Sequence, residues 1–511
     1  MTERNDKGEH KEPPRQDATA GPFRRLAAVS ARGAFWMLMS QGIIFGTNFV
    51  GIVILARFLT PADFGIMAMA ATVSNLIMMF RDVGLTTPVV QRRDLSDAQL
   101  SALYWINVTF GVALTAATIL VAPVVAWFYD QPDLTLIVSV LATGFLIGTT
   151  GAMQDALLRR NLRFAAMATI KSMAAIVALA AGIIAAWLGY GIWALVIMRL
   201  AQTATQGLGS WLASRWRPRW YQRGTEVKSL LTVAGHVSGS QLSIYLSRNA
   251  DNVLIGWYWG EHLLGLYAQA YKLLMFPLNQ IGPALNGVML PLLSRLHGDP
   301  AAYRSAYRRV TEKVVILTMP LTCLMLVFPD EVIHVLLGPQ WAEAAPILAW
   351  FGIAMIYQPV ATTTGCLLMS QNRSGLLLRQ GVMSSVVTVL GFAVALPFGP
   401  EWVAASFVLS GLVLRLPLIF WQIGREGPIR TADQYRLFIP SLWSGMFLCL
   451  AFYGLKMIPE LSERPLLMLL CAAAVTVPIT CATLAFLRSG RALMRDSVAI
   501  LKLALSRSHA G

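Results

Sequence analysis

Charged side chains are scarce in this sequence. Lys, Arg, Asp and Glu together make up 13% of the 511 residues, whereas a soluble domain carries about 25%. Hydrophobic residues account for 56% of the chain, and the mean hydropathy is +0.59. This composition excludes an ordinary soluble globular protein, because too few polar side chains are present to form its surface.

Long apolar runs stand where charge is missing. Stretches of about 20 apolar residues recur, and each is long enough to cross the ~30 Å hydrocarbon core of a bilayer as an α-helix. The sequence therefore predicts an all-α integral membrane protein with about fourteen transmembrane helices. The expected spans are 33–56, 62–80, 103–128, 134–158, 164–186, 190–212, 230–257, 263–291, 314–337, 341–369, 375–396, 402–422, 437–457 and 465–487.

The sequence also lacks the residue patterns of metal, redox and enzymatic sites. All five cysteines fall inside expected spans, which favours neither a disulfide framework nor a redox motif. The six histidines are scattered and show no metal-ligand spacing. No GxSxG, HExxH or phosphate-loop motif stands where catalysis would need it. We therefore expect no metal, no cofactor and no enzymatic activity.

Positive charge is nearly absent from every second gap between the spans. The gaps assigned to the outside hold only Arg57, Lys456 and Arg464 of the 41 Lys and Arg residues. Because Lys and Arg accumulate in cytoplasmic loops, both termini are expected in the cytoplasm and the number of spans is even. Residues 1–32 lack the apolar core and cleavage site of a signal peptide. We expect a multi-pass membrane protein.

The net charge of +15 needs no nucleic acid to explain it, because cytoplasmic loop charge faces anionic lipid headgroups. The densest cluster interleaves four arginines with three aromatic residues: Arg215, Arg217, Arg219 and Arg223 with Trp216, Trp220 and Tyr221. Basic and aromatic residues also interleave in RNA-binding patches. We interpret this cluster instead as an interfacial belt at the membrane surface.

The chain resembles itself at an offset of 200 residues. Both copies cover the first span of a half, a short outside loop and the start of the next span. Two copies with the same orientation predict two six-helix lobes related by a pseudo-two-fold axis along the membrane normal, with a binding site between them. The matches are Ser40-Gln41 with Ser240-Gln241, Phe58 with Tyr258, Gly65 with Gly265, Ala68 with Ala268 and Ala70 with Ala270.

This repeat divides the chain into six expected parts. They are a mostly disordered cytoplasmic tail (1–32), an N-terminal lobe (33–212), a basic cytoplasmic linker (213–229), a C-terminal lobe (230–422), an appended pair of helices (437–487) and a second cytoplasmic tail (488–511).

Five cations lie within the expected spans, and Asp251 is the acid most clearly placed with them. A charge at the bilayer centre costs at least ~2.5–3.5 kcal/mol on insertion scales. The excess of cations therefore predicts a hydrated cationic cavity that receives an anionic substrate. Two of the five, Lys171 and Arg415, lie nearer the cytoplasmic ends of their spans. For these two, the alternative to a cavity is that the side chain extends to the membrane surface, so that its charged group reaches water. The five are Lys171, Arg199, Arg248, Lys272 and Arg415.

The seventh expected span is the least lipid-like. Gln241, Tyr245, Arg248 and Asn252 share one helix face. Asp251 lies three residues after Arg248, within reach of it. The two side chains form either a static ion pair, or a switch in which a proton or cation bound at Asp251 frees Arg248 for the substrate.

Amides and tyrosines in other spans extend this polar set. Gln41 and Asn48 lie seven residues apart in the first span, and Tyr271 lies in the eighth. Such side chains suit sugar hydroxyls along a cavity wall. The alternative is hydrogen bonding between helices, which is common in membranes.

Two short segments resemble a known family of transporters. The first is Arg57-Phe-Leu-Thr-Pro-Ala-Asp-Phe-Gly65, followed by Ile-Met-Ala-Met-Ala. The second is Arg81-Asp-Val-Gly-Leu85, with Gln91-Arg-Arg93 behind it. Both resemble bacterial polysaccharide exporters, the lipid-linked oligosaccharide flippases of the colanic-acid and succinoglycan type. That family belongs to the superfamily of multidrug extruders, oligosaccharide-lipid flippases and polysaccharide exporters.

The resemblance implies a fourteen-helix, two-lobed carrier. It would move an undecaprenyl-pyrophosphate-linked oligosaccharide from the cytoplasmic to the periplasmic leaflet of the bacterial inner membrane for exopolysaccharide synthesis, by alternating access. It implies coupling to H⁺ or Na⁺, with Asp251 as the candidate, and a polysaccharide polymerase and a chain-length regulator as partners. The lipid tail would stay among the membrane lipids.

Three other functions compete with this one. A multidrug extruder of the same architecture usually carries cationic substrates, which a cationic cavity repels. A membrane polysaccharide polymerase or ligase would need a large outside loop with catalytic groups, and the outside loops here are short. A channel or scaffold would need neither a duplication nor cations within the membrane.

Overall fold

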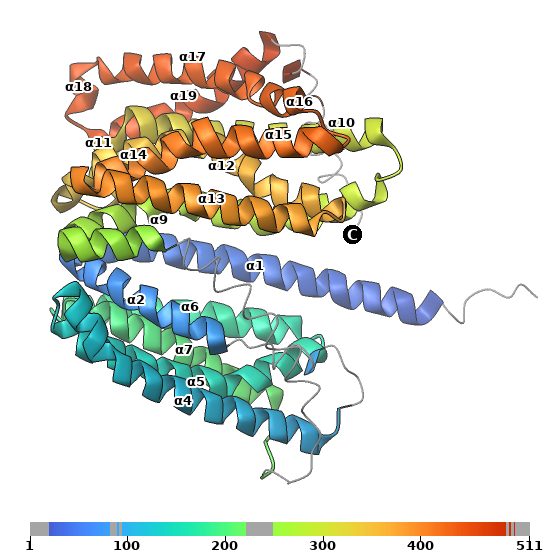
Figure 1. The fold of residues 1–511 in the computed structure, drawn as a ribbon, viewed down its shortest axis with the longest axis vertical. Coiled ribbons are helices and arrows are strands. Elements are labelled where there is room, and N and C mark those ends of the chain that lie inside the picture. Colours follow the sequence, from blue (N-terminus) through green and yellow to red (C-terminus); the bar gives the residue numbers. More distant parts are fainter. Residues whose placement is uncertain are drawn as a thin grey trace, which may run out of the picture.

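The computed structural model describes residues 20–81, 89–90, 95–220, 249–486, 490–491 and 495, and every regular element among them is a helix (Figure 1). The long helices are α1 (Ala20–Phe58), α2 (Pro61–Arg81), α4 (Asp97–Tyr129), α5 (Asp133–Arg160), α6 (Phe164–Trp187), α7 (Trp193–Ser214), α9 (Ala250–Arg295), α10 (Pro300–Val327), α12 (Ala345–Ser370), α13 (Ser374–Ala395), α17 (Ile439–Lys456) and α19 (Pro465–Phe486). The shorter elements are α11 (Pro329–Leu336), η1 (Pro339–Ala344), η2 (Leu396–Phe398), α14 (Pro400–Ser410), η3 (Gly411–Arg415), α15 (Leu416–Glu426), α16 (Thr431–Arg436) and α18 (Pro459–Ser462).

The helices confirm an all-α integral membrane protein. Ten helices of the described residues are long and apolar enough to cross a membrane, or eleven if the bent α9 counts as one span. The described chain therefore does not establish the expected fourteen. Helix α7 is long enough but is not one of the ten, because Arg199, Gln202 and Gln206 make it too polar. The seventh expected span, 230–257, falls largely outside the described residues.

The helices pack as two bundles with α1 and α9 between their bodies (Figure 1). In the N-terminal bundle, α4 packs on α5, α5 on α7, and α6 on both α7 and α1. In the C-terminal bundle, α10 and α14 pack on α12, and α13 packs on α14. Helices α17 and α19 pack on each other, and α17 joins the C-terminal bundle through α10. The main contact between the bundles is that of α2 with α9.

Two glycines make the contact of α2 with α9 possible. A Cβ on Gly65 of α2 would lie 1.7 Å from the carbonyl oxygen of Glu261, and a Cβ on Gly265 of α9 would lie 1.8 Å from the carbonyl oxygen of Pro61. The contact is reciprocal, because each glycine meets the backbone four residues before the other glycine. The paired positions differ by 200 residues, which is the offset of the sequence repeat.

The chain also breaks at related places in the two copies. Helix α1 ends at Phe58 and α2 begins at Pro61. Within α9, Gly260 has φ 77° and ψ −171°, so α9 consists of two helical segments that meet there. A φ of this kind is open to glycine at little steric cost. This break lets the second segment of α9 start beside Pro61 and cross α2 at the two glycines.

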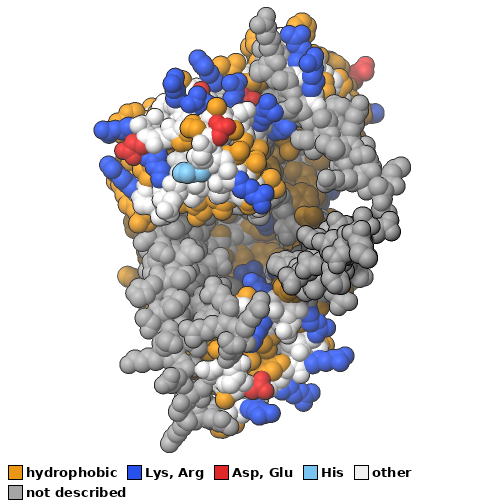
Figure 2. Space-filling model, turned by 90° about the vertical axis from the view of Figure 1, so that its right-hand side faces the viewer, with side chains coloured by type: hydrophobic (Ala, Val, Ile, Leu, Met, Phe, Trp, Pro, Cys, Tyr) orange, Lys and Arg blue, Asp and Glu red, His pale blue; other side chains and the backbone are white. Residues whose placement is uncertain are grey.

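Basic side chains distinguish the two ends of the molecule. Loops at the left in Figure 1, which include residues 59–60, 130–132, 338–344 and 457–464, carry few of them, and we call this the low-charge end. Loops at the opposite end include residues 161–163, 215–220 and 427–430, and we call it the basic end. Figure 2 faces the basic end, where Lys and Arg gather on both bundles and the surface is hollowed between them.

The basic segment after α7 lies against the basic end of α4. The indole N–H of Trp105 donates to the carbonyl oxygen of Arg219 at 2.9 Å, and the backbone N–H of Arg219 donates to the hydroxyl of Ser101 at 3.0 Å. The ring of Trp216 lies 6.1 Å from that of Tyr104. Arg215, Arg217 and Arg219 are exposed, and residues 216 and 218 between them are half-buried. This alternation of exposed and half-buried residues suits the interfacial belt that the sequence suggests.

We expect Gly65→Ala to lower the free energy of unfolding by about 1–3 kcal/mol, the usual cost of overpacking. The added methyl group collides with a backbone carbonyl, which cannot move aside as a side chain does. Gly365→Ala in α12 is the control, because its Cβ would meet open space and alanine favours a helix over glycine. Thermal unfolding of both purified variants measures the difference. An unchanged midpoint for Gly65→Ala would contradict the close crossing.

Candidate functional site: a cationic cavity between α2, α7 and α9

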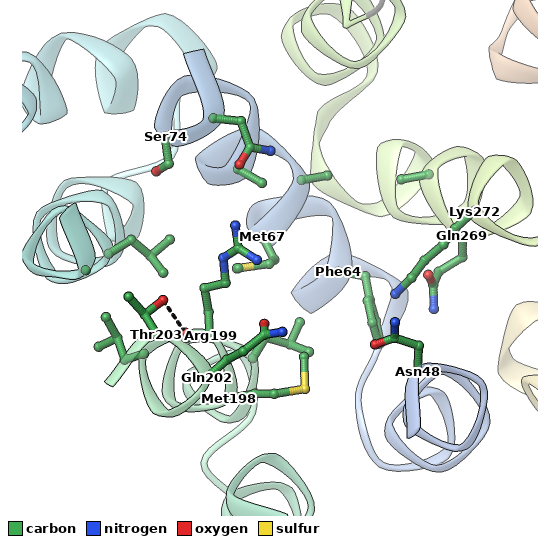
Figure 3. Close-up of a pocket in the computed structure, with 18 of the residues that line it drawn as sticks. Asn48, Phe64, Met67, Ser74, Met198, Arg199, Gln202, Thr203, Gln269 and Lys272 are labelled. Carbon is green, nitrogen blue, oxygen red and sulfur yellow. Dashed lines mark hydrogen bonds between the residues drawn. The ribbon is translucent and has the colours of Figure 1, made fainter. Parts of the chain in front are cut away.

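A cavity of about 530 Å³ lies between the N-terminal bundle and α9 (Figure 3). Its depth follows from helix geometry: Lys272 lies eleven residues after Glu261 in α9, which is about 16 Å along the helix. That distance is about half the thickness of a ~30 Å hydrocarbon core. It is lined by Asn48 of α1; Phe64, Met67, Ala68, Ala71, Ser74 and Asn75 of α2; Leu141, Gly144 and Phe145 of α5; Leu195, Met198, Arg199, Leu200, Gln202 and Thr203 of α7; and Ala268, Gln269 and Lys272 of α9.

Two cations enter this cavity from different bundles. Arg199 projects from α7 and Lys272 from α9, and both side chains point into the space between the helices (Figure 3). Among the described residues that line the cavity, none is Asp or Glu. A recess of low-dielectric walls with charge of one sign concentrates ions of the opposite sign. The cavity therefore favours an anionic ligand.

Uncharged hydrogen-bonding groups surround the two cations. Asn48 lies in this wall as the sequence suggested. The sequence analysis did not identify five others, which are Ser74, Asn75, Gln202, Thr203 and Gln269. Helical spacing would have identified most of them, because Gln202 and Thr203 lie three and four residues after Arg199, and Gln269 lies three residues before Lys272.

A second, smaller cavity of about 80 Å³ adjoins the first between α1, α6 and α7. The two share six lining residues, among them Asn48, Gln202 and Lys272. Lys272 therefore lies where the two cavities meet.

Two other predicted cations line neither of these cavities. Lys171 is half-buried on α6, about two turns from the basic end of the helix. Arg415 closes the π-helical turn η3, where its guanidinium carbon lies 4.6 Å from the ring centre of Phe407 and it donates to the Tyr357 hydroxyl at 3.3 Å. The structure thus holds Arg415 within the C-terminal bundle.

The structure describes only part of the predicted polar face of the seventh span. Gln241, Tyr245 and Arg248 lie outside the described residues. Asp251 is 4% exposed; it accepts a hydrogen bond from the Tyr267 hydroxyl at 3.0 Å and another from the backbone N–H of Asn252 at 2.9 Å.

The remaining predicted polar residues take different places. Asn252 is half-buried, and the Tyr271 ring stacks on that of Tyr267 with centres 6.3 Å apart. The side-chain amide nitrogen of Gln41 donates a hydrogen bond to the side-chain oxygen of Gln280 at 3.3 Å. This is a hydrogen bond between helices, which is the alternative to a role in the cavity wall.

The cavity is closed toward the low-charge end by side chains that cap helix ends. The last carbonyls of a helix lack intrahelical partners. The indole N–H of Trp341 donates to the carbonyl of Ala56 at 2.8 Å, and the amide of Gln340 donates to that of Leu59 at 3.0 Å. In return, Arg57 donates to the carbonyl of Val335 near the end of α11 at 2.9 Å. We call Arg57, Gln340 and Trp341 the clasp.

The clasp contacts the cavity through one aromatic pair. The ring of Phe64, which lines the cavity, meets that of Trp341 edge-on at 5.3 Å, and Trp341 is fully buried. A further bond joins the bundles at this end, from the amide of Gln131 to the carboxylate of Glu261 at 2.7 Å. The structure is thus closed at the low-charge end and hollowed at the basic end (Figure 2).

The fold is shared with solved membrane transporters. It matches the lipid II flippase MurJ in an inward closed conformation with a TM-score of 0.71 at 11% identity, over 88% of this chain and 97% of that one. It also matches an inward-facing multidrug resistance MATE transporter of the MOP superfamily with a TM-score of 0.60 at 13% identity, over 76% and 95% of the two chains. The fold is that of an all-helical, multi-pass membrane protein.

The sequence comparisons give the family. The pattern of the family described as "Polysaccharide biosynthesis protein" matches residues 54–346. The lipopolysaccharide biosynthesis protein WzxC of Escherichia coli (strain K12) is 22% identical over 82% of this chain and 85% of its own. The teichuronic acid biosynthesis protein TuaB of Bacillus subtilis (strain 168) is 27% identical over 67% and 72%. The succinoglycan biosynthesis transport protein ExoT of Rhizobium meliloti (strain 1021) is 24% identical over 66% and 68%.

This chain belongs to the polysaccharide biosynthesis protein family. The family confirms the resemblance that the two sequence segments indicated. The chain is a membrane transporter and not an enzyme, so the polymerase or ligase alternative is set aside.

The clasp gives a prediction about conformation. Trp341→Phe removes one hydrogen bond, worth about 1 kcal/mol, and should raise the ratio of molecules open at the low-charge end to closed ones about fivefold. Spin labels at Asp133 and Glu343, on opposite sides of the clasp, measure this as a larger share of long distances. Trp402→Phe, which changes an exposed tryptophan, is the control. Identical distance distributions in both variants and the parent would show that the clasp does not hold the bundles together.

Proposed function

We propose that this chain is a flippase that moves undecaprenyl-pyrophosphate-linked oligosaccharide repeat units across the bacterial inner membrane for exopolysaccharide synthesis. The observation that carries the proposal is the pair Arg199 and Lys272, which share a cavity with no acid among its described lining residues. A pyrophosphate is the charged part of such a lipid. Phosphate oxygens accept charge-assisted hydrogen bonds from guanidinium and ammonium groups.

In the proposed cycle the sugar and pyrophosphate enter the cavity from the basic end, which faces the cytoplasm if both termini are cytoplasmic. Arg199 and Lys272 make the hydrogen bonds to the pyrophosphate that water made before it entered the cavity. The polyprenyl tail stays in the lipid. The clasp then opens and the basic end closes, so that the head group leaves on the other side. The lobes 33–212 and 230–422 would rock against each other, with 437–487 as an appended pair.

The charge of the cavity argues against the multidrug-extruder alternative. A cationic drug would have to enter a space lined by Arg199 and Lys272, with no Asp or Glu among its described lining residues. The relatives named above act in teichuronic acid, lipopolysaccharide and succinoglycan biosynthesis by their names, which also favours a saccharide substrate.

The energy source of the cycle is part of the proposal. Asp251 is a buried carboxyl group whose described partners are a tyrosine hydroxyl and a backbone N–H, so H⁺ or Na⁺ binding there is one route to coupling. A static ion pair with Arg248 is the other role open to it. A polysaccharide polymerase and a chain-length regulator would receive the flipped unit.

Loss of either cavity cation should reduce transport strongly. A hydrogen bond to a charged group contributes about 1.5–3 kcal/mol, so Arg199→Ala and Lys272→Ala should each lower export roughly 10- to 100-fold, and Lys272→Arg should restore part of it. Arg248→Ala should also reduce export without preventing membrane insertion. Secreted polysaccharide per unit of inserted protein is the measurement, in a strain that lacks the native gene.

Arg464→Ala is the matched control, because it removes an exposed cation at the low-charge end, far from the cavity. Export near the parent level in Arg199→Ala, Lys272→Ala and Arg248→Ala, with all three well inserted, would remove the cationic site from the account.

A further inference from the structure

Gln269 is a buried polar residue in the wall of the large cavity. It lines the large cavity from α9, its side chain is 2% exposed, and its amide nitrogen has no hydrogen-bond partner among the described residues. A buried donor without a partner destabilises a fold, because the water it lost has not been replaced. Such a group persists most readily where a ligand supplies the missing bond.

Ser74 presents the same feature from the opposite wall. It lies on α2, is 8% exposed and lines the cavity, and its hydroxyl has no partner in the part of the chain that the structure describes. Other buried serines are paired: Ser172 donates to Ser40 at 3.0 Å, and Ser441 donates to the carbonyl of Phe438 at 2.9 Å. The unpaired hydroxyl of Ser74 therefore departs from what this chain does with serines elsewhere.

The chemistry of these two groups differs from that of the cations. An amide and a hydroxyl each both donate and accept hydrogen bonds, and Asn75, Gln202 and Thr203 in the same wall do likewise. A pyrophosphate offers acceptors only, which Arg199 and Lys272 satisfy. A sugar offers hydroxyl groups that donate as well as accept, so it matches the uncharged part of the wall.

The order of residues along α9 places the two kinds of site side by side. Gln269 lies three residues before Lys272, so both side chains lie on one face of the helix about one turn apart. A ligand group that meets Gln269 must therefore be adjacent to the group that meets Lys272. In a lipid-linked saccharide, the hydroxylated group adjacent to the pyrophosphate is the first sugar.

We propose that Ser74 and Gln269 bind hydroxyl groups of the sugar attached to the pyrophosphate, and so determine which head groups the transporter accepts. This rests on the proposed function, because Lys272 must hold the pyrophosphate for Gln269 to meet that sugar. The two subsites are separable: Lys272 and Arg199 bind the charge that all such lipids share, and Ser74 and Gln269 bind the part in which they differ.

The test compares lipids with and without the sugar on the full-length chain in lipid nanodiscs. The probes are undecaprenyl pyrophosphate alone and the same lipid carrying one glucose, galactose or N-acetylglucosamine. We expect the parent to bind the best of the three sugar lipids about tenfold more tightly than undecaprenyl pyrophosphate, the gain from one or two added hydrogen bonds. Gln269→Leu and Ser74→Ala should each reduce that ratio toward one and leave the affinity for undecaprenyl pyrophosphate unchanged.

Gln380→Leu is the matched control. Gln380 is 4% exposed on α13, it too has an amide nitrogen without a described partner, and it lies outside the cavity. The variant should leave both affinities unchanged.

Thermal unfolding separates binding from folding, because replacing an unpaired buried amide by an apolar group is close to neutral or stabilising. Gln269→Leu should therefore lose sugar discrimination at an unchanged or higher midpoint.

The outcomes separate this proposal from the proposed function. A parent-like ratio in Gln269→Leu and Ser74→Ala would overturn the sugar subsite and leave the flippase standing. Equal weakening of both kinds of probe in Gln269→Leu would also overturn it, since the amide would then bind phosphate. If the parent binds none of the pyrophosphate lipids, or binds them as well after Lys272→Ala, the proposed function itself fails, and the sugar subsite fails with it.

Discussion

A charge inside a membrane must meet water, a partner or a ligand, and the rest of this structure depends on how that constraint is met. Arg199 and Lys272 lie on different helices within the bilayer depth, where an unsolvated cation is costly. The helices open a cavity of about 530 Å³ around them. The cavity requires polar residues on α7, and these residues make α7 too polar to be recognised as a membrane span. The same residues that weaken the membrane signal therefore form the site.

The close approach of α2 and α9 makes such a cavity compatible with a closed end. Because residues 65 and 265 are glycines, the backbones of α2 and α9 touch each other. This contact closes the space next to Phe64 without bulky side chains at those two positions. The clasp adds directional bonds there, because helix ends leave carbonyls unpaired and Trp341, Gln340 and Arg57 meet them across the bundle boundary. Bonds of this kind can be exchanged for water on opening, whereas an apolar seal of the same area would resist it.

Much of the fold could be predicted from the sequence, because span length follows from bilayer thickness. The expected span 134–158 lies within α5, Asp133–Arg160. Arg199 and Lys272 were predicted to line a cavity, and both do, since a cation in an apolar span has few other places to go. Ser74 and Gln269 were not identified, because a lone amide or serine in a span is usually bonded to a neighbouring helix. Only the packed structure shows that the Ser74 hydroxyl and the Gln269 amide nitrogen have no hydrogen-bond partner among the described residues.

The most direct test of the flippase is the fate of its substrate in a deletion strain of the source bacterium. Undecaprenyl-linked intermediates and secreted polysaccharide would be measured together, with the parent gene restored as the control. The account predicts complete repeat units that accumulate on the cytoplasmic leaflet, and no secreted polymer. Unchanged polymer and lipid pools, in a strain shown to have no second flippase, would contradict it. Single repeat units that accumulate on the periplasmic leaflet would contradict it as well, because they place the defect after translocation.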